Sequence, residues 1–238
     1  MRMKKVIYRL LLIGAFFIGI GFFSPILESW IIDCYQPKIN SQNSLQNNGI
    51  NDWNSVKYIT ILSLIRQFFK NDIKYQEVLI VPSLNMEVPV AENTNDAVYQ
   101  FGAGMLVKRK IDSNSNIIIG AHNLGSFSKA LFSPLANNKL IDREVFITDF
   151  KLVKEYKIES VRIIFPTQVN LALNSKSNFL TMLTCTNDNK KRILVRATLR
   201  KTYKFSKVGS SVKTFIKRKN FIIQAKTYSY NKSKNSIF

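Results

Sequence analysis

Short β-rich runs separated by polar breaks dominate the chain from about Tyr75 onward. The runs are Glu77–Pro82, Met86–Val90, Asn116–Gly120, Glu144–Asp149, Tyr156–Pro166, Phe179–Cys185 and Arg192–Tyr203. Many short strands with few helices predict an all-β barrel or sandwich. One short helix is expected around Asn95–Tyr99, because the Asn95 side chain can accept a hydrogen bond at a helix start.

The N-terminal part has a different pattern, an uncharged apolar run from Leu10 to Leu27. As a helix this run is about 27 Å long, close to the thickness of a bilayer core. Four basic residues precede it, and Glu28 and Asp33 follow it. Because basic residues prefer the cytoplasmic side, we expect an uncleaved signal anchor with a cytoplasmic N-terminus and an exported remainder. A cleaved signal peptide is the alternative, although the run is long for one and no clear A-x-A site follows.

Three further segments complete the expected organisation. The Asn/Gln/Ser-rich stretch Gln36–Asn54 predicts a spacer, and Val56–Lys70 has the apolar spacing of an amphipathic helix. The chain beyond Ser206 is basic and polar apart from one apolar patch, Phe221 to Ile223, and is expected to be a poorly ordered extension. The expected divisions are a basic N-terminus (1–9), an anchor (10–27), a spacer with a helix (28–74), a β-domain (75–206) and a C-terminal extension (207–238).

Charge narrows the possible partners. The chain has 35 Lys and Arg residues against 15 Asp and Glu residues, a formal net charge of +20. This balance favours nucleic acid, anionic lipid or an acidic wall polymer, and the predicted export disfavours nucleic acid. A compositional bias with no specific partner is equally open, since the basic residues are scattered along the chain. Two cysteines exclude a disulfide scaffold.

The last two β-rich runs carry the candidate chemistry. Phe179–Cys185 leads into the polar six-residue loop 186–191, and Arg192 begins the next run. If the two runs form a hairpin, Cys185 and Arg192 face each other, while Arg196 lies about 13 Å farther along the strand. A guanidinium favours a neighbouring thiolate and can hydrogen-bond an acyl oxygen that gains negative charge. The spacing therefore predicts Arg192 as the cationic neighbour of Cys185.

His122 is the only histidine in the chain and follows the apolar run Ile117–Gly120. An imidazole can protonate a leaving amine and deprotonate an incoming one. Cys34 lies just past the apolar N-terminal run, so Cys185 is the cysteine to pair with His122. Structural interpretations are also open: a small buried Cys185, an exposed His122 and a solvated charge on Arg192.

A set of motifs in one order resembles the class A sortases, a family of membrane-anchored enzymes on Gram-positive surfaces. The motifs are Thr181-Met182-Leu183-Thr184-Cys185 (family TLxTC, with Met182 for Leu), Arg192-Ile193-Leu194-Val195 (family R-[IV]-x-V), Gly120-Ala121-His122-Asn123 around the histidine, Leu131-Phe132-Ser133-Pro134-Leu135 after it, and Tyr99 to Gly104 (family Y-G-A-G turn). The resemblance spans roughly residues 75 to 205.

The resemblance implies a mainly β fold, a sortase-like eight-stranded β-barrel with short helices, preceded by an N-terminal transmembrane helix. It implies a cysteine transpeptidase that cleaves an LPxTG-like sorting signal between Thr and Gly. The acyl group would pass to an amine of a cell-wall precursor, anchoring surface proteins to the wall. The expected partners are LPxTG-containing surface proteins, the peptidoglycan precursor and the membrane itself, through residues 10–27, with the catalytic domain outside the cell.

The resemblance also implies roles for the site residues. Cys185 attacks the Thr carbonyl, His122 transfers the protons and Arg192 holds the substrate and stabilises the oxyanion. The expected substrate-binding residues are Thr184, Ala121 and Leu183. No cofactor or metal ligand is expected; some relatives use calcium, but no convincing acidic cluster is present. Two other functions are open: an exported basic β-domain that binds anionic wall polymers or lipids without catalysis, and a hydrolytic cysteine protease.

Overall fold

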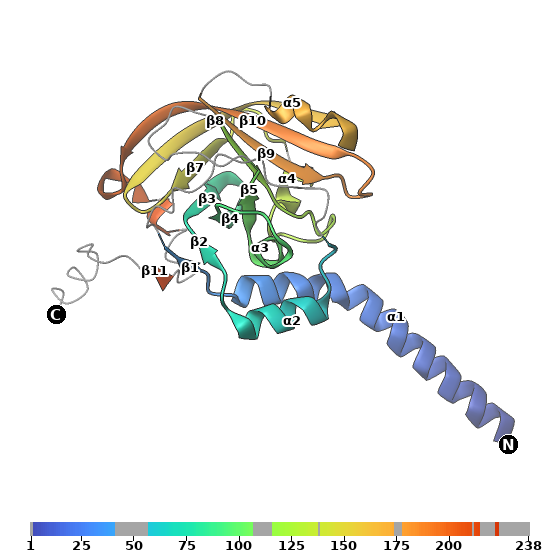
Figure 1. Cartoon of the computed structure of the whole chain (residues 1–238). Helices are drawn as coiled ribbons and strands as arrows, with labels where there is room; N and C mark the ends of the chain where they lie inside the picture. Colours follow the sequence, from blue (N-terminus) through green and yellow to red (C-terminus); the bar gives the residue numbers. More distant parts are fainter. Residues whose placement is uncertain are drawn as a thin grey trace, which may run out of the picture.

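The core of the fold is a closed β-barrel (Figure 1). The computed structural model describes residues 2–40, 57–106, 116–137, 139–173, 178–210, 212–214 and 222–223. The barrel strands are β3 (Glu77–Val81), β4 (Met86–Ala91), β5 (Ala103–Met105), β6 (Ile117–Gly120), β7 (Glu144–Thr148), β8 (Leu152–Ile164), β9 (Phe179–Cys185) and β10 (Arg192–Lys204). Their order around the barrel is β10-β8-β7-β3-β4-β5-β6-β9. The expected eight-stranded barrel is confirmed.

The side chains of β6, β9 and β10 alternate between two apolar clusters. The main core takes Ile117, Ile119, Leu180, Met182, Ile193, Val195 and Ala197. A smaller cluster on the opposite face takes Ile118, Leu183 and Leu194. This two-residue period is that of strands covered on both faces. Met182, which departs from the family motif, is fully buried in the main core, where its side chain has a volume similar to that of leucine.

Short helices fill the connections between the strands. They are α2 (Ile61–Lys70), α3 (Asp96–Phe101), α4 (Ser133–Asn137), α5 (Asn170–Leu173) and the 3₁₀ turns η1 (Pro82–Leu84), η2 (Pro166–Gln168) and η3 (Phe205–Lys207). The predicted Asn95 cap is confirmed, since its Oδ1 accepts a 2.9 Å hydrogen bond from the Val98 N–H. The helix predicted over Val56–Lys70 begins later, at Ile61. Thr60 and Ser63 form a capping box that sets this start.

A single helix, α1 (Arg2–Cys34), leads away from the barrel toward the N-terminus (Figure 1). It includes the uncharged run that was expected to form a transmembrane anchor. Among the described residues, no helix is found with the length and apolarity needed to cross a membrane.

The expected spacer and C-terminal extension differ in part from the structure. A small sheet, in the order β11-β1-β2, joins β1 (Lys38–Ile39), β2 (Lys74–Tyr75) and β11 (Ile222–Ile223). The start of the expected spacer is thus packed on the domain, because its apolar side chains are buried: Ile39 is fully buried, and the Tyr35 ring before it stacks on Phe101 at 4.0 Å. Residues 41–56 and most of the chain beyond 214 lie outside the described residues.

Candidate active site

Strand β9 lies between β6 and β10, and its two pairings assemble the candidate site. In the antiparallel pairing with β10, Cys185 is opposite Arg192 and Thr181 is opposite Arg196. This confirms the predicted hairpin register. In the parallel pairing with β6, Gly120 is opposite Leu183.

Two hydrogen bonds continue the β6–β9 pairing beyond the end of β6. The Ala121 N–H donates to the Leu183 carbonyl at 3.3 Å, and the Thr184 hydroxyl donates to the Ala121 carbonyl at 2.8 Å. The next position in this register places the backbone of His122 beside that of Cys185. The three residues therefore converge on one edge of the barrel, where the ends of β6 and β9 meet the start of β10.

The Cys185 side chain is half-buried, whereas Cys34 is exposed. Burial raises the pKa of the Cys185 thiol above its ordinary value, and the positive charge of Arg192 partly offsets this rise. Desolvation is the larger effect, because a thiolate loses more from burial than a neutral thiol does. Cys185 is therefore a neutral thiol at neutral pH, with Arg192 as the charge that favours its ionisation.

The His122 ring is largely enclosed. Burial lowers the pKa of His122 to about 4, against a smaller upward effect of a hydrogen bond to the Lys57 backbone and of the Asp96 charge. The Tyr99 ring packs edge-on against it, with centroids 5.9 Å apart. Its Nε2 atom is buried and has no hydrogen-bond partner among the described residues. At neutral pH the imidazole is thus uncharged, with one nitrogen free to exchange a proton.

The Arg192 guanidinium is held by its own hairpin. Its Nη1 donates to the carbonyls of Asn189 and Lys191, both at 3.2 Å. Its Nε is buried and without a partner in the described part of the chain. Arg196 is directed elsewhere, since its Nη2 donates to the Leu171 carbonyl at 2.6 Å. The Nε of Arg196 is likewise buried without a partner among the described residues. Arg192 is distinguished by its place opposite Cys185 and by its electrostatic effect on the thiol.

The expected substrate-binding residues lie beneath the site. Thr184 and Ala121 are fully buried, and so is Leu183 in the smaller apolar cluster. Their positions follow from the alternation of faces, which turns Thr184 and Ala121 into the barrel. The structure therefore gives them contacts that hold the two strands together, rather than a surface that faces solvent.

An asparagine network beside Cys185 was missed by the sequence analysis. The Asn123 Nδ2 donates to the Cys185 carbonyl at 2.9 Å and to the Asn187 Oδ1 at 2.8 Å. Asn187 Nδ2 in turn donates to Ser126 Oγ at 2.9 Å. The network ties the loop after His122 to the loop after Cys185. The one available signal was that a polar residue directly follows the histidine.

The segment before α2 also reaches the site. The Lys57 N–H donates to Asp96 Oδ1 at 3.1 Å, and its Nζ lies 3.6 Å from Asp96 Oδ2. Lys57 thereby joins α3 while its backbone bonds the His122 ring. Nothing in the sequence pattern indicated this contact, because more than sixty residues separate Lys57 from His122.

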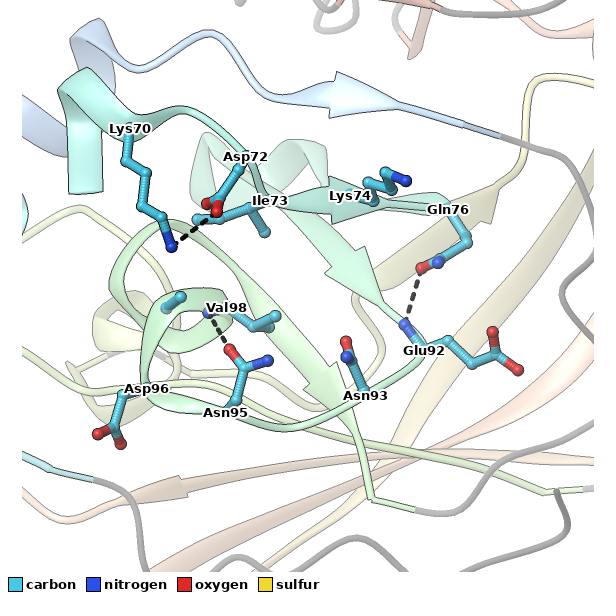
Figure 2. A pocket seen from close by; sticks show the side chains of 11 residues that line it. Lys70, Asp72, Ile73, Lys74, Gln76, Glu92, Asn93, Asn95, Asp96 and Val98 are labelled. Carbon is cyan, nitrogen blue, oxygen red and sulfur yellow. Dashed lines mark hydrogen bonds and ion pairs between the residues drawn. The ribbon is translucent and has the colours of Figure 1, made fainter. Parts of the chain in front are cut away.

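A cavity of about 710 Å³, lined by both polar and apolar side chains, lies next to this contact (Figure 2). Its wall includes Lys70, Asp72, Gln76, Glu92, Asn95 and Asp96. α3 connects the cavity wall to the His122 ring, because it carries both Asp96 and Tyr99. Within the described ranges, no three His, Cys, Asp or Glu side chains are grouped so that they could hold a metal ion.

Comparison with known sequences identifies relatives. The family model of the sortase domain matches residues 79–200. Sortase A of Streptococcus agalactiae is 29% identical over 179 residues, which cover 72% of this chain and 72% of the relative. Sortase A of Listeria monocytogenes is 26% identical over 217 residues, covering 86% of this chain and 94% of the relative.

Solved structures show the same fold. Listeria monocytogenes sortase A is 23% identical with a TM-score of 0.52, covering 61% of this chain and 97% of that chain. Sortase C-3 of Streptococcus pneumoniae is 20% identical with a TM-score of 0.53, covering 72% and 82%. The resemblance to class A sortases is thus confirmed by two relatives named sortase A and by a family model that spans half of the chain. The chain belongs to the sortase family and is a cysteine transpeptidase.

Proposed function

We propose that this enzyme cleaves an LPxTG-like sorting signal between Thr and Gly and transfers the acyl group to an amine of a cell-wall precursor. The observation that carries the proposal is the strand register around β9. This register sets Cys185 opposite Arg192 and beside His122, the residue that follows Ala121. Family membership supports the reaction class and leaves a purely binding function without support.

In the first half-reaction, the Cys185 Sγ attacks the Thr carbonyl carbon. Its proton passes to the neutral His122, and the imidazolium then donates it to the leaving glycine amine. The products are a thioester on Cys185 and a free amine, so charge and protons balance. The low pKa of His122 favours this donation, because an imidazolium with a pKa of about 4 is a strong proton donor.

In the second half-reaction, an incoming amine attacks the thioester. His122 accepts the proton of the amine as the new amide bond forms, and the proton returns to the Cys185 thiolate that leaves. No external energy source is needed, since the thioester conserves the reactivity of the cleaved peptide bond.

Arg192 stabilises the negative charge that develops on the carbonyl oxygen in both steps. The proposal is supported by its position opposite Cys185 and by the unused, buried Nε donor. A preorganised donor of this kind contributes to the transition state more than to the bound substrate. Thr184, Ala121 and Leu183 act as positioning residues behind the site.

We further propose that residues 10–27 anchor the enzyme in the cell membrane, with the N-terminus in the cytoplasm and the barrel outside. The support is the uncharged run within α1 and the basic residues that precede it. Its substrates would then be LPxTG-containing surface proteins and a precursor amine at the membrane surface.

The test is a Cys185→Ala variant assayed on a fluorogenic LPxTG peptide, with and without an added amine. We expect loss of both cleavage and amide product. The matched control is Cys34→Ala, which removes the other thiol and should retain both. Full activity in Cys185→Ala would overturn the nucleophile assignment. Cleavage by the unaltered enzyme that gives only hydrolysis, whatever amine is added, would instead indicate a protease.

A further inference from the structure

The short helix α2 exposes large apolar side chains along one edge. Leu62 is 70% exposed, Ile65 is 41% exposed and Phe69 is 81% exposed. These positions are three and four residues apart and therefore share one face of the helix. The adjoining face, with Leu64 and Gln67, is buried against the domain. α2 thus has two apolar edges: one packs against the domain and the other faces solvent.

The C-terminal half of α1 repeats this arrangement. Phe23 is 68% exposed, Ile26 is 59% exposed and Trp30 is 62% exposed, again three and four residues apart. Ile31 and Ile32, on the other side of the helix, are buried. α1 and α2 lie side by side beneath the barrel (Figure 1). Two neighbouring helices therefore leave apolar edges uncovered.

A loop of the candidate site adds to this surface. Phe127 is 90% exposed, and its neighbour Ser128 forms a 2.8 Å hydroxyl–hydroxyl hydrogen bond with Ser29, next to Trp30 in α1. The loop that follows His122 is thereby fixed to the exposed helix. We name the three elements together the apolar base, consisting of Phe23, Ile26, Trp30, Leu62, Ile65, Phe69 and Phe127.

Charge and continuity identify what covers the apolar base. The exposed Arg66 adjoins the apolar edge of α2, as does Lys70, whose charge is partly offset by an ion pair with Asp72 at 2.8 Å. The chain as a whole carries a net charge of +20. Apolar side chains with a basic flank are typical of helices that lie in the interface of an anionic bilayer. In addition, Phe23 and Ile26 belong to the uncharged run 10–27, so α1 joins this surface directly to the proposed anchor.

We propose that the apolar base docks the barrel onto an anionic bilayer: Phe23 and Ile26 form the outer end of the anchor, and Trp30, the apolar edge of α2 and Phe127 rest in the headgroup region. The inference rests on the membrane localisation proposed above and extends it. The anchor alone would leave the domain free to rotate above the lipid. The base fixes its orientation, and through Phe127 it holds the site loop close to the membrane surface.

The direct test uses the full chain in vesicles of phosphatidylcholine and phosphatidylglycerol. In a Cys34→Ser, Cys185→Ser background, a Leu62→Cys variant carries one environment-sensitive fluorophore. Nitroxide-labelled lipids should remove most of its emission, and aqueous iodide should remove little. The matched control is Ile163→Cys, because Ile163 is 64% exposed and belongs to β8. Figure 1 shows β8 on the side of the barrel away from α2. There iodide should quench strongly and nitroxide lipids weakly.

Other outcomes would overturn the proposal. Equal iodide quenching at the two positions would mean that the apolar base faces water. Protection of Leu62→Cys from both quenchers would mean that a protein, such as a second copy, covers it. Flotation of the same vesicles distinguishes a failure of the docking proposal from a failure of the proposed membrane localisation. If the chain does not float, the anchor is wrong; if it floats with Leu62→Cys in water, only the docking is wrong.

A second variant, Leu62→Gln with Phe69→Gln, retains Cys34 and Cys185. It should keep its activity on a soluble LPxTG peptide, since neither residue lies in the site. For a second measurement, the same two substitutions are made in the Cys34→Ser, Cys185→Ser background with Ile163→Cys as the single labelled site. We expect its fluorescence anisotropy in vesicles to be lower than that of the labelled parent, because the undocked barrel rotates more freely. An unchanged anisotropy would contradict a docking role for α2.

Discussion

The Thr184 hydroxyl donates a 2.8 Å hydrogen bond to the Ala121 carbonyl, joining β9 to the residue between β6 and His122. Each partner directly precedes one of the two residues proposed to carry the chemistry. Both are fully buried, so the bond is shielded from competing water. It therefore sets the separation of Cys185 and His122 through the backbone rather than through the side chains themselves.

Replacing Thr184 with Val keeps the shape and removes the hydroxyl. The Ala121 carbonyl is then left buried without this donor, which should lower the free energy of unfolding by about 1–3 kcal/mol. We also expect a fall in kcat with little change in KM, because the nucleophile and base are no longer held in register. Chemical denaturation and steady-state assays on an LPxTG peptide measure the two effects.

Thr181→Val is the matched control for this change. Thr181 is also fully buried in β9, but its hydroxyl has no hydrogen-bond partner among the described residues. Its removal should leave stability unchanged or increased, and activity intact. Equal losses in both variants would show that the Thr184 bond has no special role in the site.

Arg192→Lys keeps a positive charge but loses the planar donor fork of the guanidinium. Loss of an oxyanion donor typically lowers kcat by roughly a hundredfold to a thousandfold, and we expect a loss in that range. Arg196→Lys should have a much smaller effect on kcat, since Arg196 bonds the Leu171 carbonyl instead. If Arg196→Lys is the more damaging change, the assignment of the oxyanion donor is wrong.

The pH profile of kcat/KM should be bell-shaped, with a broad optimum. Below about pH 4 the His122 ring is protonated before it can accept the thiol proton, so activity falls on the acid side. Above the raised pKa of Cys185 the thiolate forms while His122 is neutral, so no proton is available for the leaving amine. Arg192→Ala should move the alkaline limb to higher pH, because it removes the charge that favours the thiolate. An alkaline limb below the pKa of an unperturbed cysteine, about 8.5, would contradict a raised Cys185 pKa in the unaltered enzyme.

Stability should also depend on pH through His122. Its pKa is about 4 in the folded state against 6.5 for an unperturbed histidine, so the unfolded chain binds more protons between these values. Stability is therefore lost as the pH falls from about 6.5 to 4, by up to about 3 kcal/mol. His122→Asn should flatten this part of the profile in urea denaturation. His122 is the sole histidine, so an unchanged profile would show that its ring is not protected from protonation.

Local patterns predicted an all-β fold, either a barrel or a sandwich, and half of the site, whereas the eight-stranded barrel was implied by the motif resemblance. The pairing of Cys185 with Arg192 was predictable, since two strands joined by a short polar loop have a definite register. The placement of His122 was not, because it depends on the parallel pairing of β6 with β9 across 63 residues. The motif resemblance supplied it instead. The Lys57–Asp96 contact and the β1–β11 pairing are likewise long-range, and no local preference encodes them.

The parallel pairing of β6 with β9 has a consequence for folding. The hairpins β3–β4, β7–β8 and β9–β10 connect neighbours in sequence and can form early. Joining β6 to β9 closes the barrel and requires a long loop to be ordered, which is a slow event. The same event brings His122 to Cys185. A partly folded chain, even one with most of its hairpins formed, therefore has no assembled thiol–imidazole pair until the barrel closes.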